Sequence, residues 1–425
     1  MRTAVVLFTR DLRVHDNPAL HAAWLAAQTL VPLFVRDPGV NAPPNRRRFL
    51  DESLDDLRRS LRERGGELFL RSGDPVAEAV KIARRTDADA IFVADDVSAF
   101  AAARRRRLQE ACARERLALG LHDCVTIVPP GALHPAGRDH YAVFTPYWRA
   151  WSSIRPRAQL PAPDRVRTPH GIDAGQLSLG RATGLVPGGE GPAWTRLHAW
   201  RHDASTYARS HDDLAGDATS RMSPYLHFGC ISPVTVAASV DSPEYRRQLC
   251  WRDFFHQVLH AFPDLPRRNY RAGAADNWRD DPTALAAWRE GRTGIPIVDA
   301  GMRQLASEGW MHNRARLITA SFLTKHCWLD WRAGAGWYGE LLVDADLANN
   351  TGNWQWVAGT GNDPRPNRSF NPIRQAQRFD RDGDYVRRWV PELAHVPGRA
   401  VHEPWRLTPS ERRALRYGGP LAPTG

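Results

Sequence analysis

The chain has few cysteines, almost no lysine and no long apolar run. Its five cysteines, in 425 residues, are Cys112, Cys124, Cys230, Cys250 and Cys327, and no two of them form a C-x-x-C pair. This spacing argues against a disulfide framework, a zinc site and a four-cysteine iron–sulfur site, and it fits a reducing, cytoplasmic compartment. The N-terminus reaches charged residues too soon for a secretory signal, and no apolar stretch could span a bilayer. We therefore expect no membrane partner.

Positive charge is carried almost entirely by arginine. Lys81 and Lys325 are the only lysines among 58 basic residues, and the net charge is +11. A basic balance indicates a polyanionic partner such as nucleic acid. A genomic bias towards arginine codons would also explain the arginine excess, although it explains the excess over acidic residues less well.

The first 127 residues alternate short apolar runs with helical patterns. The expected strands are Ala4–Phe8, Leu30–Val35, Leu68–Arg71, Ala90–Ala94 and Ala118–His122. Helical stretches such as 48–64 and 75–85 lie between them, which predicts a doubly wound, Rossmann-like parallel sheet. Ligands bind such sheets beyond the strand ends, here at 9–16 and 95–100. No G-x-G-x-x-G follows the first strand, so a dinucleotide is not indicated in its usual place.

The remainder of the chain divides into a connector and a helical part. Residues 128–195 are rich in proline, glycine and arginine, with a short helix expected over 144–154. The clearest later helices are expected over 249–259, 284–290, 298–309 and 313–328. Asp299 is expected on the polar face of the third of these helices. We predict three parts, an α/β domain over 1–127, a connector over 128–195 and a helical domain over 196–425.

The most informative stretch runs from Trp310 to Trp356. It contains six tryptophans, several arginines and aspartates, and an NNTGN run. Indoles stack on flat rings, and they are the side chains that an excited chromophore oxidises most easily. The stretch therefore favours a redox or light-driven site over acid–base hydrolysis.

The segment TSRMSPYL, which begins at Thr219, has the pattern of a helix start. Ser223 is expected as the N-cap, with Pro224 at the first helical position. Backbone N–H groups at a helix start bind phosphate, so the segment could hold a diphosphate-bearing cofactor. Helix capping alone would also explain it.

Two other clusters allow more than one interpretation. Gln248 and Trp251, three apart on one helical face, could hold a flat heterocycle, or they could be a surface amide beside a core indole. Asp344 and Asp346 could be metal ligands, but no third ligand has convincing spacing. We therefore predict no metal site.

Taken together, these segments resemble the photolyase/cryptochrome family, and in particular the bacterial class I cyclobutane pyrimidine dimer photolyases. The motifs are FTRDLRVHDNPAL, TSRMSPYL, CWRDFF, GIPIVDAGMRQLASEGWMHNRARLITASFL, DADLANNTGNWQW and VPGRAVHEPW. The resemblance covers essentially the whole chain and is weakest in the connector.

The resemblance implies FAD in the helical domain. The residues expected to hold it are Tyr207, Thr219, Ser220, Arg221, Met222, Ser223, Arg252, Asn313, Arg316, Asp344, Asp346 and Asn350. Arg316 and Asp344 would pair beside the isoalloxazine, and Asn350 would face its N5. The family's electron chain corresponds to Trp354, Trp331 and Trp278, although three core tryptophans would give the same pattern.

The resemblance also implies a monomeric deoxyribodipyrimidine photolyase acting on UV-damaged DNA. Excited reduced FAD would donate an electron to a flipped-out dimer, which would split without a general acid or base. The residues expected at the substrate and DNA are Gln248, Trp251, Asn313, Arg314, Leu317 and Trp356. Stacking returns about 1–3 kcal/mol per base and could offset the cost of flipping.

Three positions depart from the family pattern. Gln248 replaces the usual Glu, Leu317 the usual Met, and His211 an expected Arg. The neutral amide keeps hydrogen bonds but cannot release a proton, so we expect lesion binding with reduced repair yield. The family's (6-4) photolyases have His at positions 313 and 317, so Asn313 and Leu317 argue against that activity. A cryptochrome-type photoreceptor remains the alternative, and a light-independent DNA-binding flavoprotein is less well supported.

The resemblance places an antenna chromophore in the N-terminal domain. Arg46 and Asp96 align loosely with residues that contact 8-hydroxy-5-deazaflavin in some members. Methenyltetrahydrofolate and an empty pocket are the alternatives, and Arg46 could instead be a solvated arginine at a helix start.

Overall fold

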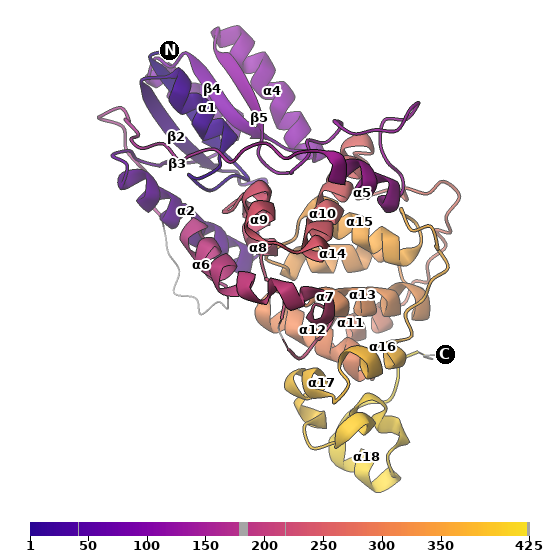
Figure 1. Cartoon of the computed structure of the whole chain (residues 1–425). Coiled ribbons are helices and arrows are strands. Elements are labelled where there is room, and N and C mark those ends of the chain that lie inside the picture. The colour runs from indigo at the N-terminus through magenta and orange to yellow at the C-terminus, as the bar shows by residue number, and fades with distance from the viewer. Residues whose placement is uncertain (41, 178–185, 217, 423–425) are drawn as a thin grey trace. The chain divides into compact units, whose positions relative to one another are not determined.

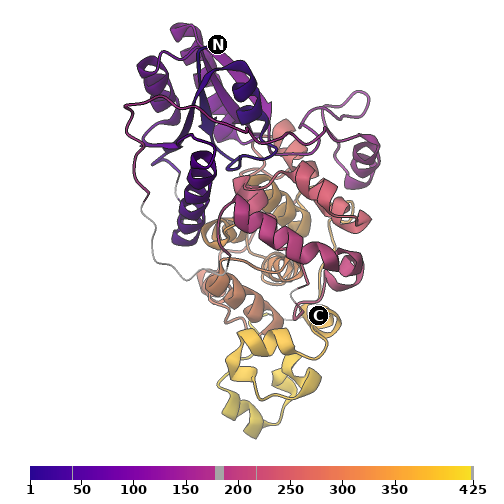
Figure 2. The same ribbon diagram turned by 60° about the vertical axis from the view of Figure 1, so that its left-hand side comes forward.

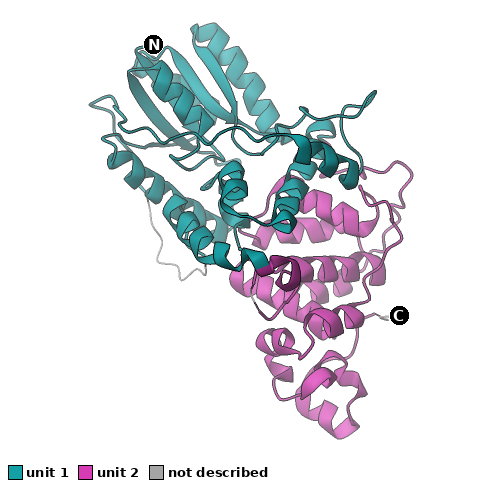
Figure 3. Ribbon diagram, viewed as in Figure 1, with its two compact units in different colours: residues 1–205, 220–263 teal, residues 206–219, 264–425 magenta. Residues whose placement is uncertain are grey.

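The computed structural model describes residues 1–40, 42–177, 186–216 and 218–422, so part of the predicted connector, 178–185, lies outside the described residues. The chain forms two compact units (Figure 3). Unit 1 comprises Met1–Ser205 and Ser220–Pro263, and unit 2 comprises Thr206–Thr219 and Asp264–Gly425. The division into 1–127, 128–195 and 196–425 stays a prediction.

Unit 1 contains a five-stranded parallel sheet (Figure 1). Its strands are β1 (Thr3–Phe8), β2 (Thr29–Arg36), β3 (Phe69–Ser72), β4 (Ala90–Asp95) and β5 (Ala118–Asp123), in the order β3-β2-β1-β4-β5. All five predicted strands are confirmed, each within one residue at either end. Strands buried on both faces of a sheet have nearly continuous apolar sequences, as β1, β2 and β4 do, whereas β5 is only partly buried.

The crossover helices bury alternate strand residues on opposite faces of the sheet. They are α1 (Pro18–Ala26), α2 (Pro44–Arg62), α3 (Pro75–Arg85) and α4 (Ala99–Glu115). Val5 and Leu7 pack in one cluster with Val76 of α3 and Leu108 of α4, whereas Ala94 packs elsewhere, against α1. Right-handed crossovers produce this arrangement when the strand order reverses, as it does between β1 and β4.

The remaining helices of unit 1 lie outside the sheet. They are α5 (Phe144–Ser153), α6 (Glu190–Trp200), the 3₁₀ helix η1 (Arg201–Thr206), α8 (Ser223–Phe228), α9 (Pro233–Ser239) and α10 (Pro243–Ala261). The prediction that Ser223 caps α8 is wrong, because Met222 occupies the N-cap and Ser223 is the first helical residue. The preceding Arg221 has φ +50°, and Met222 already has helical φ and ψ, so the helix begins one residue earlier than expected.

Unit 2 is helical. Its elements are α7 (Tyr207–Ser210), α11 (Pro282–Arg289), α12 (Pro296–Glu308), α13 (Asn313–Ser321), the π-helix η2 (Phe322–His326), α14 (Trp331–Leu341), α15 (Leu347–Ala358), α16 (Pro372–Phe379), α17 (Asp384–Trp389), η3 (Pro391–Leu393), η4 (Gly398–His402), η5 (Pro404–Arg406) and α18 (Pro409–Leu415). Helices α16 to α18 gather at one end of this unit (Figure 2). None of the described helices is long and apolar enough to cross a membrane.

The core of unit 2 is built around three indoles, Trp288, Trp331 and Trp354, each at most 2% exposed. Asp299, expected on a polar face, is instead fully buried. Its carboxylate accepts hydrogen bonds from the backbone and hydroxyl of Thr293 and from the Tyr417 hydroxyl, so neighbouring segments satisfy its oxygens. The predicted helix over 313–328 is present, but it widens into a π-turn after Ser321.

Candidate cofactor and substrate sites

A cavity in unit 2 brings together side chains that the sequence analysis selected from three separate segments. Its lining includes Asn313, Arg316, Leu317, Asp344, Asn350 and Trp354. They come from α13, the turn before α15, and α15 itself, and α13 and α15 pack against each other. The fold thus places one ion pair, four asparagine amides and an indole around one space.

The ion pair at this cavity joins Arg316 to Asp344. Nη2 of Arg316 lies 3.0 and 2.8 Å from the two carboxylate oxygens, and Nε donates to the Met311 carbonyl at 2.9 Å. The Asp344 side chain is 1% exposed, so its negative charge depends on the guanidinium for compensation. The pair is therefore a fixed dipole in the cavity wall.

The start of α15 orders the other polar groups. Asp346 is the N-cap, and its Oδ1 accepts from the backbone and side-chain nitrogens of Asn349 at 2.9 and 2.7 Å. One turn later, the amide nitrogen of Asn350 donates to the Ala335 carbonyl at 2.9 Å. This bond uses the amide nitrogen and leaves the oxygen of Asn350 as the acceptor that the side chain can offer to a ligand.

Trp354 forms the apolar wall. A Cβ at Gly334 would lie 2.2 Å from Cη2 of this indole, so only glycine permits the packing of α14 on α15. Trp288 and Tyr338 contact the ring edge-on. Its buried Nε1 has no hydrogen-bond partner among the described residues, and an acceptor atom on a bound ligand would satisfy it.

The lining fits a flavin ring. A planar, apolar heterocycle with donors and acceptors on its edge matches an indole wall, a guanidinium–carboxylate pair and an amide oxygen. The described residues contain no cluster of three or more side chains that could hold a metal ion.

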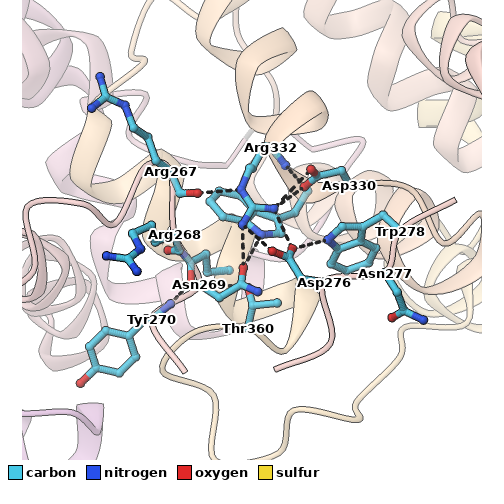
Figure 4. Close-up of polar contacts among 12 residues, drawn as sticks. Arg267, Arg268, Asn269, Tyr270, Asp276, Asn277, Trp278, Asp330, Arg332 and Thr360 are labelled. Atoms are coloured by element: carbon cyan, nitrogen blue, oxygen red, sulfur yellow. Dashed lines mark hydrogen bonds and ion pairs between the residues drawn. The ribbon is translucent and has the colours of Figure 1, made fainter. Parts of the chain in front are cut away.

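The other two predicted relay indoles also lie in unit 2. Trp331 is fully buried, and its Nε1 donates to Oδ1 of Asn269 at 3.0 Å. Trp278 is half-buried, and its Nε1 donates to Oδ1 of Asp276 at 3.0 Å (Figure 4). Burial therefore decreases along the predicted order from Trp354 and Trp331 to Trp278.

The predicted phosphate-binding segment crosses the division of the chain, since Tyr207 and Thr219 belong to unit 2 and residues 220–223 to unit 1. Within unit 1, the Ser220 hydroxyl contacts the Tyr245 hydroxyl at 2.9 Å, and the Ser220 carbonyl accepts from Arg196 at 2.8 Å. Arg221 adopts the left-handed conformation, which non-glycine residues rarely hold without a structural or functional reason.

Helix α10 of unit 1 carries Gln248, Trp251 and Arg252. Gln248 is exposed, whereas Arg252 is buried and donates to the carbonyls of Val125 and Leu226. Phe144 of α5 stacks on Trp251 with a centroid distance of 3.6 Å and an interplanar angle of 3°. One face of this indole is therefore already covered within unit 1.

The remaining substrate residues are on unit 2. Asn313 is exposed at the first position of α13. The Arg314 guanidinium makes a bidentate ion pair with Asp212, with nitrogen–oxygen distances of 2.7 to 3.0 Å, and lies 4.3 Å from the Phe379 ring centroid. Trp356 has the Arg368 guanidinium 4.9 Å from its ring centroid.

The candidate antenna residues belong to different elements of unit 1. Arg46 is near the start of α2, and Asp96 follows β4, where its carboxylate pairs with Arg10 at 3.1 Å. A small cavity at the ends of β4 and β5 includes Asp96 in its lining but not Arg46. Burial and the neighbouring Asp95 raise the pKa of Asp123 in the same cavity.

Sequence reasoning missed several side chains that control the predicted ones. They are Phe144, Asp212, Asp276, Arg332 and Arg368. Their partners are 2 to 107 residues away or directly adjacent, and an aspartate or arginine on a charged surface carries no local signal of such pairing. Only the Trp278–Asp276 spacing and the adjacency of Trp331 and Arg332 were close enough to suggest a contact.

Comparisons with known proteins indicate one family for both parts of the chain. Residues 4–164 match the DNA photolyase family, and residues 245–420 match the FAD binding domain of DNA photolyase. A deoxyribodipyrimidine photo-lyase of Streptomyces griseus is 48% identical, with 99% of this chain and 96% of the relative covered. A cryptochrome DASH of Danio rerio is 36% identical over 96% of this chain and 87% of its own length.

A solved structure is similar throughout. The crystal structure of a bacterial class III photolyase from Agrobacterium tumefaciens has a TM-score of 0.93 at 34% identity and covers 100% of this chain and 95% of that chain. The predicted likeness to class I members therefore stays a prediction at the level of the branch. At the level of the family the matches in sequence and fold agree, and the chain belongs to the DNA photolyase family.

Proposed function

We propose that this chain is a deoxyribodipyrimidine photolyase that uses light to split cyclobutane pyrimidine dimers in UV-damaged DNA. The observation that carries the proposal is the cavity lined by Arg316, Asp344, Asn350 and Trp354. FAD would bind there, and in its reduced form it supplies the light-driven electron that opens the cyclobutane ring. The relative named deoxyribodipyrimidine photo-lyase supports this activity.

The chain's own residues would bind and orient the cofactor. The Arg316–Asp344 pair would present a fixed charge pair to the ring edge, and the Asn350 oxygen would accept a ring N–H. Asp346, the N-cap of α15, would order the turn between Asp344 and Asn350. The remaining proposed contacts, to the phosphates, ribose and ring surroundings, are Tyr207, Thr219, Ser220, Arg221, Met222, Ser223, Arg252 and Asn313.

Substrate binding would rest on aromatic stacking and one amide. Trp251 and Trp356 would each stack on a base, which contributes about 1–3 kcal/mol per base. Asn313, exposed at the cavity lining, would hydrogen-bond the lesion, and Leu317 would supply an apolar contact. Gln248 would hydrogen-bond without adding charge, and Arg314 would contact a DNA phosphate.

The three indoles Trp354, Trp331 and Trp278 would carry electrons between the surface and the cavity. Their exposure supports this role, since two are at most 2% exposed and the third is half-buried. Buried indoles are protected from side reactions with water, whereas the outermost ring can exchange electrons with a soluble reductant.

We also propose that the chain works as a monomer in the cytoplasm and carries an antenna chromophore in unit 1. The five buried free thiols support a reducing compartment. The polar cavity beyond β4 and β5 supports a ligand at the sheet edge, although its lining favours a contact from Asp96 more than from Arg46. Either 8-hydroxy-5-deazaflavin or methenyltetrahydrofolate would fill the antenna role.

The decisive experiment is illumination of the reduced, FAD-loaded protein with an oligonucleotide that contains one thymine dimer. Recovery of thymine absorbance under blue light, and none in the dark, is the expected result. The Asn350→Ala variant, which removes the amide oxygen, should bind DNA normally and recover less thymine. Flavin-loaded wild type that recovers no thymine would refute the repair function.

A cryptochrome-type photoreceptor is the second candidate. The observation that favours it is the exposed, neutral Gln248 on α10, where the family's repair enzymes have a carboxylate. The relative named cryptochrome DASH is consistent with it. Light-dependent change in the protein without thymine recovery would support this function instead.

A further inference from the structure

We infer that the Arg332–Asp276 ion pair biases the tryptophan relay outward, so that a positive charge is more stable on Trp278 than on Trp331. The inference deepens the proposed function, because that function makes these two indoles neighbours in a relay. It concerns the charges around the rings, which the choice of relay residues does not specify.

The inner ring has a cation above it. Arg332 follows Trp331 at the start of α14, and its Cζ lies 4.9 Å from the Trp331 ring centroid. Trp331 is fully buried, so little water can screen the guanidinium from the ring. A fixed positive charge at this distance makes it harder to remove an electron from the Trp331 ring.

The outer ring has an anion at its edge. Oδ1 of Asp276 accepts from Nε1 of Trp278 at 3.0 Å and from Nη1 of Arg332 at 2.9 Å (Figure 4). The hydrogen bonds from Arg332 are the main reason that the pKa of Asp276 is lowered, so the carboxylate stays ionised. A negative charge bonded to the indole N–H stabilises a positive charge on Trp278.

The other groups around the two indoles preserve this difference in charge between Trp331 and Trp278. Nε1 of Trp331 donates to the neutral amide of Asn269 at 3.0 Å, so the inner indole has an uncharged acceptor and the outer one an anionic acceptor. Asp330 also pairs with Arg332, at 3.1 Å, and weakens the cation without bonding to either indole nitrogen. The Arg267 carbonyl accepts from Nε of Arg332 at 2.8 Å and fixes the guanidinium in place.

The step that this ion pair would favour is a single electron transfer. One electron moves from the Trp278 ring to the oxidised Trp331 ring, so Trp331 is reduced and Trp278 is oxidised. No bond forms or breaks, and the indole proton stays on Trp278 because Asp276 is a weak base. The oxidant that starts the relay is a photoexcited oxidised flavin. Arg332 and Asp276 are positioning residues, since neither gains nor loses an electron.

The test is flash photolysis of the FAD-loaded chain, with the surviving tryptophan radical as the spectroscopic signal. Asp276→Asn keeps an oxygen acceptor for Trp278 but removes the charge, and we expect about a tenfold lower surviving fraction, equivalent to about 1.4 kcal/mol. Asp276→Glu should restore most of it. The matched control is Glu392→Gln, which removes the carboxylate of the Arg303–Glu392 pair, 2.7 Å long, elsewhere in unit 2.

Measurements on the flavin-free chain test whether Asp276→Asn disturbs the fold. There, Asp276→Asn and Glu392→Gln should show the same unfolding temperature. The inference is overturned if the tryptophan radical survives equally in Asp276→Asn and Glu392→Gln while Trp278→Phe still abolishes the radical signal. An unchanged signal in Trp278→Phe overturns the relay as well. Repair by chemically reduced protein does not need the relay, so failure of the repair function appears separately in that assay.

Discussion

Replacing Asp212 with Asn should strengthen the binding of this chain to DNA. Arg314, the proposed phosphate contact, has its Nη2 2.7 and 2.8 Å from the Asp212 oxygens and its Nε 3.0 Å from one of them. The two side chains are 18% and 25% exposed, so the pair is partly screened by water. A phosphate must compete with this carboxylate, and the substitution removes the competitor while the Phe379 ring still supports the guanidinium.

The size of the effect follows from the ion pair. A partly exposed pair contributes about 1 kcal/mol, which corresponds to about a fivefold lower Kd. If one further phosphate is neutralised, the slope of log K against log salt concentration becomes steeper by about 0.9. Over a fourfold change in salt concentration, this slope corresponds to an additional change of about 3.5-fold in affinity. Fluorescence anisotropy with a labelled duplex, with and without one thymine dimer, at several salt concentrations measures both quantities.

The control is Asp213→Asn, which removes the same charge one residue later. Among the described residues, Asp213 accepts hydrogen bonds only from the backbone nitrogens of Ala215 and Gly216, at 3.1 and 3.2 Å. If both variants gain affinity equally, net charge explains the result and the competition argument is wrong. A gain on undamaged and damaged duplex alike is expected, because phosphate contacts carry no information on the lesion.

Three further substitutions test the cavity and the substrate site. Gly334→Ala should destabilise the fold by about 1–3 kcal/mol by overpacking, because the added Cβ would lie 2.2 Å from Trp354. Gly336→Ala, whose Cβ would have nothing within 4 Å, should leave the stability unchanged. Urea unfolding of the two variants compares their stabilities. Asp344→Asn should weaken FAD binding at least tenfold in a fluorescence titration, because it leaves the paired guanidinium without its counter-charge; unchanged affinity would remove the pair from the site. Gln248→Glu should raise thymine recovery per absorbed photon, and an equal yield would show that the amide does not limit repair.

The sequence predicted the positions of the strands better than the ends of the helices. β1, β2 and β4 are buried along nearly their whole length, so their apolar runs gave their positions within one residue, whereas β5 is only partly buried. Helix ends were less predictable, because backbone conformation decides them. Arg221 enters the left-handed region and makes Met222 the cap of α8, and the π-turn after Ser321 alters the helix that follows Asn313.

The candidate cavity was predictable only as a set of residues. The motifs named Arg316, Asp344, Asn350 and Trp354, and the fold brings them to one lining. Periodicity could not show that Asp299 is buried, because its hydrogen-bond partners include a tyrosine 118 residues later in the chain. A polar residue on a helix is exposed or buried according to what packs on it.

By itself, the sequence determined the fold class, the family resemblance and the chemical types of the site residues, because apolar periodicity and motif order are local properties of the chain. The tertiary structure alone decided which charges act on those residues. Asp212 neutralises Arg314, Phe144 covers one face of Trp251, and Asp276 bonds to an indole whose neighbour has a guanidinium above it. Electrostatic and stacking interactions fall off over a few ångströms, so they depend on distances through space that no spacing along the chain specifies.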